Sequence, residues 1–344
     1  MVGKVHHAMA DGIAATEIAL LLFDSSPTTE PGDAPVWRPG SAPANTRLAL
    51  DALVDAAGAP LQIARALGRA PRRAVAGVVP TVGRAAHALR EDVLRPTSRA
   101  FLNPSGATRR TLIGHPVALE RLRVAKRDPG VTTNDVCLAA VAGSLRHLAI
   151  GSGERPSALK AMIPVNIRDG ENLGNRISLA FIRLPVDVPT ASERLALVHQ
   201  RTRAFKGAGR AAGMHTLLRA AGLLPTPLRT PLARAAGSPR LFNLTVSSIP
   251  GPNVPMYLLG AELATVYPIV PMLAEHALSI GIFTHREHAH FGLYADPHAL
   301  PEVGDLPRLL DREIAMLGGG RSSPRTRRTA RAARPPRAPA TAPV

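Results

Sequence analysis

The chain of 344 residues is 45% hydrophobic, as is typical of globular proteins, and its length predicts two domains, or one domain and part of another. Its 42 basic and 25 acidic side chains give a net charge of +17, which favours nucleic acid, an anionic membrane or an anionic ligand as the partner. The single cysteine, Cys137, excludes an internal disulfide and a zinc site built from several cysteines, and it fits a reducing intracellular compartment.

The amino-terminal stretch carries two adjacent histidines, His6 and His7, followed by Asp11 and Gly12. Imidazole titrates near neutrality, so a histidine can take a proton from an alcohol and return one to a leaving group. Gly12 tolerates backbone conformations that other residues avoid, which would let the chain turn sharply into a helix over residues 12–24. The alternative is a histidine pair that closes a strand, with Asp-Gly as the turn before that helix.

A linker and a basic helical segment are expected next, and the helical segment has two possible roles. Residues 27–44 are rich in Pro, Gly and Ser and predict a linker. Residues 47–94 have a helical pattern that three prolines should break into short helices, and residues 61–99 combine eight arginines with two acidic residues. A basic face beside an apolar face is typical of helices that lie on anionic lipid. It equally fits a helical crossing that packs on a domain and keeps its arginines in water.

From residue 110 onward, helical and strand patterns alternate. Strands are expected over residues 110–114, 159–165, 177–184, 242–249, 257–267, 275–284 and 290–295, and helices over 116–126, 133–148, 191–206, 214–224, 228–235 and 306–317. Thr133 is the expected N-cap of the helix that carries Asn134, Asp135 and Cys137; capping is also the alternative role of Asn134, and Cys137 is expected in the core. This order of elements predicts a layered α/β fold.

The rest of the sequence argues against several classes of site. Residues 319–344 contain seven arginines and no acidic residue, so we expect a disordered tail that touches water or anionic lipid.

Three prolines in the uncharged span 241–261 exclude a regular membrane-spanning helix, and no signal peptide is evident. We therefore expect a cytoplasmic protein, soluble or peripheral to membranes or lipid droplets. His285, His288 and His290 lack a carboxylate or cysteine at ligand spacing, so we expect no metal site.

The motifs, taken in order, resemble those of one enzyme family. His6, His7, Asp11 and Gly12 match an HHxxxDG motif, followed by Asn134-Asp135, by Pro-Val-Asn-Ile-Arg at 164–168, by Leu-Gly-Asn-Arg at 173–176 and by Pro-Gly-Pro at 250–252. HHxxxDG alone is shared by several families of CoA-dependent acyltransferases. The ordered set, from His6 to about Leu317, is similar to the bacterial wax ester synthase/diacylglycerol acyltransferase family. Ser248 departs from it, because the family usually has Ser-Asn-Val-Pro-Gly-Pro here, and serine removes an amide that could hold a substrate.

The resemblance implies roles for individual residues. His7 would be the general base with His6 beside it, and Asp11 would be structural, paired with an arginine, with Gly12 as the turn. The residues expected to line the substrate channel are Asn134, Asp135, Asn166, Arg168, Gly174, Asn175, Arg176, Ser248, Pro250 and Gly251. The resemblance implies no metal and no cofactor, with acyl-CoA as a substrate.

The resemblance also implies the two-domain fold of chloramphenicol acetyltransferase-like enzymes, with the active site in a channel between the domains. The expected division is a remnant of the amino-terminal domain (1–26), a linker and basic helical crossing (27–108), a carboxy-terminal acyltransferase domain (109–318) and the tail (319–344). Only five residues precede His6, too few for a central strand whose neighbours must be paired and covered. We therefore expect most of the first domain to be missing, a true start upstream of Met1, and little activity from residues 1–344 alone.

The expected function is transfer of a fatty acyl group from acyl-CoA to diacylglycerol, with long-chain alcohols as a further acceptor that would give wax esters. The alternative is a non-catalytic remnant of such an enzyme that binds lipid surfaces through its basic helices and tail. Nucleic-acid binding rests on net charge alone, because the sequence has no Walker-type loop, zinc-finger spacing or RNA-binding signature.

Overall fold

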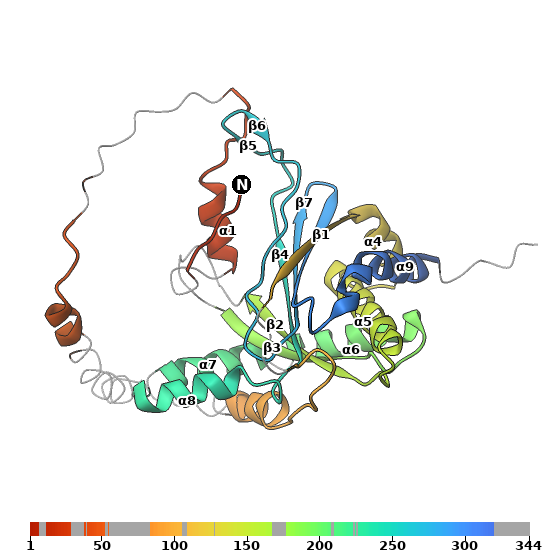
Figure 1. Cartoon of the computed structure of the whole chain (residues 1–344), viewed down its shortest axis with the longest axis horizontal. Coiled ribbons are helices and arrows are strands. Elements are labelled where there is room, and N and C mark those ends of the chain that lie inside the picture. Colours follow the sequence, from red (N-terminus) through yellow and green to blue (C-terminus); the bar gives the residue numbers. More distant parts are fainter. Residues whose placement is uncertain are drawn as a thin grey trace, which may run out of the picture.

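A six-stranded sheet is the centre of the protein in the computed structural model (Figure 1). The structure describes residues 1–6, 12–28, 38, 40–51, 54, 83–104, 109–126, 128–166, 177–207, 210–222, 224 and 226–319. In their order across the sheet, the strands are β1 (Thr111–Ala118), β8 (His288–Ala295), β7 (Leu278–His285), β4 (Leu244–Pro250), β2 (Leu159–Asn166) and β3 (Ile177–Leu184). Strands β7, β4 and β2 are parallel neighbours, whereas the other neighbouring pairs are antiparallel. The carboxyl ends of three adjacent strands therefore lie at the same end of the sheet.

Four helices cover one face of this sheet and bury the main core against it (Figure 1). They are α4 (Leu119–Ala125), α5 (Thr133–Gly151), α6 (Ala191–Gly207) and α9 (Leu306–Gly319), the last preceded by a 3₁₀ turn at Pro301–Asp305. Thirteen of the nineteen residues of α5 are buried, because its middle is an uncharged run of small and apolar side chains. Helix α5 therefore lies between the sheet and the outer helices.

A buried ion pair joins the helices that flank α5. The side chains of Arg194 on α6 and Glu313 on α9 are almost fully buried and bonded to each other. Glu313 also contacts Nε2 of His147, at 3.0 Å, and Arg194 donates to the backbone oxygens of residues 188 and 189. A Cβ on Gly143 of α5 would lie 2.7 Å from the Arg194 guanidinium, so glycine makes room for the pair.

On the opposite face, a row of glycines receives a crossing segment. The register places Gly114, Gly292 and Gly281 side by side on β1, β8 and β7. Tyr267 packs on Gly114 and Pro268 packs on the other two, at distances that exclude a Cβ. Three aligned positions without side chains therefore let the chain cross the sheet in direct contact with its backbone.

Two further helices and residues 83–104 pack at the β3 side of the sheet. Helix α7 (Arg210–Gly222) precedes α8 (Thr226–Ala236), and residues 83–88 are helical and continue into a π-helical turn at Leu89–Val93. A second apolar cluster there consists of Ala88, Phe181, Met214, Leu241 and Phe242. Two asparagines tie the end of residues 83–104 to the sheet. The side-chain amide of Asn243, directly before β4, donates to Oδ1 of Asn103 at 2.8 Å.

The amino-terminal helix α1 (Gly12–Leu20) is joined to a small hairpin, β5 (Tyr257–Leu258) and β6 (Ala261–Glu262). The backbones of Asp24 and Tyr257 exchange two hydrogen bonds of 2.8 and 2.9 Å, so residues far apart in sequence form an isolated bridge. In Figure 1 this hairpin lies beyond the end of the sheet, beside the chain that leads from α1.

The layered α/β class predicted from sequence is confirmed, and most element positions agree. The helix expected over 116–126 is wrong in its first part, because β1 continues to Ala118; as an edge strand paired only with β8, it tolerates Pro116. The strand expected over 257–267 is wrong as well, because Leu259 and Gly260 both have positive φ and form a turn between β5 and β6. The N-cap of α5 is Thr132 rather than Thr133. Much of the predicted basic crossing lies outside the described residues, and the expected domain division stays a prediction.

Candidate active site

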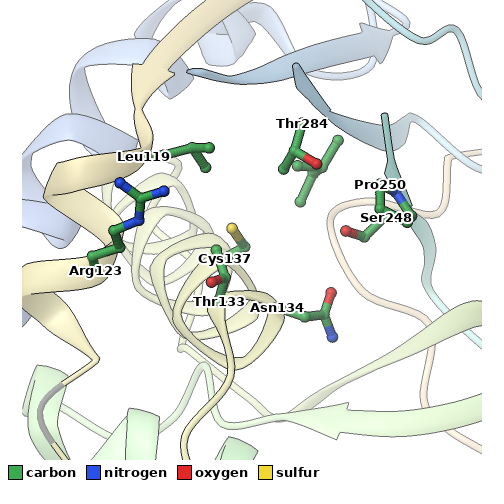
Figure 2. A pocket seen from close by; sticks show the side chains of 9 residues that line it. Leu119, Arg123, Thr133, Asn134, Cys137, Ser248, Pro250 and Thr284 are labelled. Carbon is green, nitrogen blue, oxygen red and sulfur yellow. The ribbon is translucent and has the colours of Figure 1, made fainter. Parts of the chain in front are cut away.

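A pocket of about 300 Å³ lies where the carboxyl ends of β4 and β7 face the amino terminus of α5 (Figure 2). Its lining residues come from four elements, α4, α5, β4 and β7, and are Leu119, Arg123, Thr133, Asn134, Cys137, Ser248, Pro250, Ile282 and Thr284. The carboxyl ends of parallel strands are a common place for ligand sites in open α/β sheets, because the chain diverges there. Figure 2 shows the polar ends of Asn134 and Ser248 on the same side of this space.

A capping network fixes the α5 end of the pocket. The backbone N–H of Asp135 donates to the Thr132 hydroxyl, and the Asp135 carboxylate accepts from the Thr132 N–H at 2.9 Å. This carboxylate also contacts Nδ1 of His199 at 3.0 Å and accepts from Thr202 at 2.7 Å. Burial alone would raise the pKa of Asp135, but these hydrogen bonds outweigh it and hold the pKa below its usual value. The first turn of α5 is thereby tied to α6, with Asn134 turned to the pocket.

The sheet register sets the opposite wall. Ser248 and Pro250 of β4 lie beside Ile282 and Thr284 of β7, and all four line the pocket. Just past β4, the N–H of Gly251 donates to the Thr284 carbonyl at 2.8 Å, and a Cβ at Gly251 would meet the Phe283 ring. The glycine therefore lets the chain leave the sheet in contact with β7.

The chemistry available in the pocket is that of neutral hydrogen-bonding groups plus one cation. The lining offers the Asn134 amide and the hydroxyls of Thr133, Ser248 and Thr284. Burial raises the pKa of the Cys137 thiol to about 12, so the thiol stays protonated at neutral pH. Arg123 contributes an exposed side chain to the lining, and its guanidinium lies 3.6 Å from the Glu120 carboxylate. Among the lining residues there is no histidine or carboxylate, so a general base has to come from another part of the chain.

The structure brings together three of the predicted channel residues, Asn134, Ser248 and Pro250. Gly251 lies directly beside them in the chain, whereas the Asp135 side chain is directed to α6 and does not line the pocket. Asn166 ends β2, and because β2 runs parallel to β4, the two strands end on the same side of the sheet.

The remaining predicted residues are mostly outside the described part of the chain. His6 is described and exposed, and Gly12 begins α1. His7, Asp11, the Asn166 side chain, Arg168, Gly174, Asn175 and Arg176 lie outside the described residues. Arg123 and Thr284 were not predicted; Thr284 could have been found only from its register with Pro250.

The described residues contain no group of three or more histidine, cysteine, aspartate or glutamate side chains placed to hold a metal ion. His285 and His290 are buried on neighbouring strands, whereas His288 is exposed. Nor does any helix in the described ranges combine the length and apolarity needed to cross a membrane.

Comparison with known proteins places this architecture in a family. A model described as the wax ester synthase/diacylglycerol acyltransferase catalytic domain matches residues 1–137, and one described as the WS/DGAT C-terminal domain matches residues 173–318. Among solved structures, a wax ester synthase/diacylglycerol acyltransferase from Marinobacter aquaeolei VT8 is similar with a TM-score of 0.59 and 25% identity, over 92% of this chain and 67% of that one.

Curated relatives agree with this result. A Mycobacterium tuberculosis protein named "Probable diacyglycerol O-acyltransferase tgs1" is 31% identical over 324 residues, which are 91% of this chain and 67% of the relative. "O-acyltransferase WSD" from Acinetobacter baylyi is 29% identical over 223 residues, 64% of this chain and 49% of the relative. The chain spans about two thirds or less of the length of these relatives. Taken with the ordered motifs and the shared fold, these matches show that the chain belongs to the wax ester synthase/diacylglycerol acyltransferase family.

Proposed function

We propose that the protein transfers a fatty acyl group from acyl-CoA to the free hydroxyl of diacylglycerol, with long-chain alcohols as further acceptors. The names of its relatives support this reaction class. The observation that carries the proposal is the pocket, because it gathers Asn134, Ser248 and Pro250 from motifs that are far apart in the sequence. Its neutral hydrogen-bonding groups suit the oxygens of an ester-forming reaction better than a metal or a redox centre.

In the proposed mechanism, His7 accepts the hydroxyl proton while the acceptor oxygen attacks the thioester carbonyl. The C–S bond then breaks, and the protonated His7 returns the proton to the departing CoA thiolate. General-base assistance of this kind contributes about 10²–10⁴-fold in rate. The Asn134 amide and the Ser248 hydroxyl hold the reacting groups in the pocket, which converts a bimolecular step into a positioned one. Acyl-CoA enters as a substrate, and the reaction needs no further cofactor.

The proposed setting is the surface of a cytoplasmic membrane or lipid droplet, where diacylglycerol resides. The net charge of +17 supports an anionic partner, since Lys and Arg near an anionic bilayer are attracted to it.

The test is triacylglycerol formation and CoA-thiol release by the purified chain, measured with His7→Ala and His6→Ala. We expect His7→Ala to lower the rate at least about hundredfold, since it removes the base, and His6→Ala to cost less. Circular dichroism checks that both variants fold. Equal residual activity in the two variants would contradict the assignment of His7.

A further inference from the structure

Helix α8 is amphipathic and unusually exposed. Each of its described side chains, from residue 227 to 236, is exposed. Leu228 and Leu232 are 56% and 44% exposed and, four residues apart, lie on one face of the helix. At 3.6 residues per turn, Arg229 falls about 100° to one side of Leu228 and Arg234 about 120° to the other. An apolar stripe is thus flanked by an arginine on each side.

Further exposed leucines lie on and just after the neighbouring helix α7. Leu218, near the end of α7, and Leu224, in the connection between α7 and α8, are 39% and 37% exposed. Figure 1 shows α7 and α8 side by side at the outside of the molecule. We call Leu218, Leu224, Leu228 and Leu232 the α7–α8 leucine patch. Helix α8 carries no buried side chain among its described residues, so its leucines contribute to the surface of the described part of the chain rather than to its core.

The stretch of sequence that carries the patch has charged residues of one sign only. Between Glu193 and Glu262 the sequence contains no acidic residue, while it contains nine lysines and arginines. A protein-binding surface usually mixes charges at its rim, whereas an interfacial helix combines a shallow apolar face with basic residues whose long stems reach up to phosphates. The leucines and basic residues of α7 and α8 follow the pattern of an interfacial helix.

We propose that the α7–α8 leucine patch docks the protein on anionic phospholipid, with Leu228 and Leu232 in the acyl-chain boundary and Arg234 at the phosphates. The inference rests on the proposed function, because the acceptor and the product of that reaction are lipids that dissolve in a membrane or droplet. None of the pocket-lining residues belongs to α7 or α8, so docking through this patch leaves the pocket uncovered.

The first test measures binding of the full chain to vesicles of phosphatidylcholine alone and with 30 mol% phosphatidylglycerol. The double change Leu228→Ser and Leu232→Ser should weaken binding to the anionic vesicles at least tenfold. Arg234→Ala should weaken it several-fold and make it less sensitive to salt, because one phosphate contact is lost. The matched controls are Ile150→Ser, 52% exposed at the end of α5, and Arg155→Ala, exposed in the following loop; both should bind within about twofold of the unaltered protein.

The second test separates insertion of the patch from attraction of the arginine-rich tail. Cys137 is the only cysteine and is buried, so Leu232→Cys and, as control, Ile150→Cys can be labelled selectively with an environment-sensitive fluorophore. The label at position 232 should be quenched by lipids brominated on their acyl chains, and the label at 150 should not. Equal quenching at both positions, or undiminished vesicle binding by the double serine variant, would overturn the proposal. So would unchanged binding accompanied by self-association that the serine changes abolish, which would indicate a second copy as the occupant. Neither readout uses turnover, so an inactive enzyme would leave this inference intact.

Discussion

Gly292 on β8 lies directly beneath the backbone carbonyl of Pro268, and this contact leaves no room for a side chain. Its neighbour Gly281 is in a similar position, since a Cβ there would come within 2.8 Å of the Pro268 ring. The close approach of the crossing segment to the sheet at Pro268 therefore requires glycine at both positions.

We predict that Gly292→Ala lowers the free energy of unfolding by about 2–3 kcal/mol, because the crossing segment must move away from the sheet. Urea unfolding followed by circular dichroism measures this change. The matched control is Gly151→Ala at the end of α5, where a Cβ would meet nothing within 4 Å. That variant should be neutral or slightly more stable, as alanine favours helix. An equal effect of both changes would contradict the tight contact.

Because Arg194 and Glu313 form a buried ion pair, we predict that the effects of changing them on stability are strongly coupled. Removing either partner, by Arg194→Met or Glu313→Leu, leaves a buried charge alone and should cost about 3–5 kcal/mol. The double variant should recover most of that loss, because no unpaired charge remains. A double-mutant cycle in urea gives the coupling energy. Losses that simply add would show that the two side chains do not act as a pair.

Burial lowers the pKa of His290 to about 4, and the nearby His288 and His285 lower it further in the same direction. The folded protein therefore keeps His290 neutral, while the unfolded chain takes up a proton near pH 6.5. Stability that is complete above pH 6.5 should fall as the pH drops towards 4, by up to about 3 kcal/mol. The Asp135 carboxylate, with its lowered pKa, adds a further loss only at more acidic pH, below its ordinary value of 3.8.

The measurement is the free energy of unfolding at several pH values between 7 and 4. His290→Gln should flatten the dependence, because glutamine does not titrate. His288→Gln, at an exposed position of the same strand, should change it much less. If the pH dependence of the free energy of unfolding is unchanged in His290→Gln, groups other than His290 cause it.

The pocket predicts a steric effect at Ser248. Ser248→Leu should fill space between β4 and α5 and lower kcat/KM for acyl transfer at least tenfold, with an unchanged melting temperature. Ser248→Ala keeps the space open and removes only the hydroxyl, so it should lower kcat/KM much less than Ser248→Leu does. Full activity of the leucine variant would place the substrate elsewhere.

Patterns within one element allowed much of the fold to be predicted. The strand over 177–184 and the helices after it follow from apolar runs and periodicity, and they agree with the structure closely. Failures occurred where tertiary context decides: Pro116 is tolerated because β1 is an edge strand, and the turn at Leu259 forms although leucine rarely adopts positive φ.

The residues of the candidate site fall into two groups: those that lie in sequence motifs, and those that only the fold brings to the pocket. Asn134, Ser248 and Pro250 were predicted because they lie in motifs that resemble a family, and the structure gathers them. Arg123 and Thr284 belong to no motif. They reach the pocket only through the packing of α4 and the register of β7, which a single sequence does not display.

The bridge between Asp24 and Tyr257 also bears on the order in which the molecule assembles. Closing so long a loop costs entropy that two backbone hydrogen bonds cannot offset, so the bridge should form after the sheet has brought the β5–β6 hairpin into place. Helix α1 begins at Gly12, the last residue of the histidine motif. The bridge would then be among the first contacts to open, with amide hydrogens at Asp24 and Tyr257 exchanging sooner than those between β7 and β8.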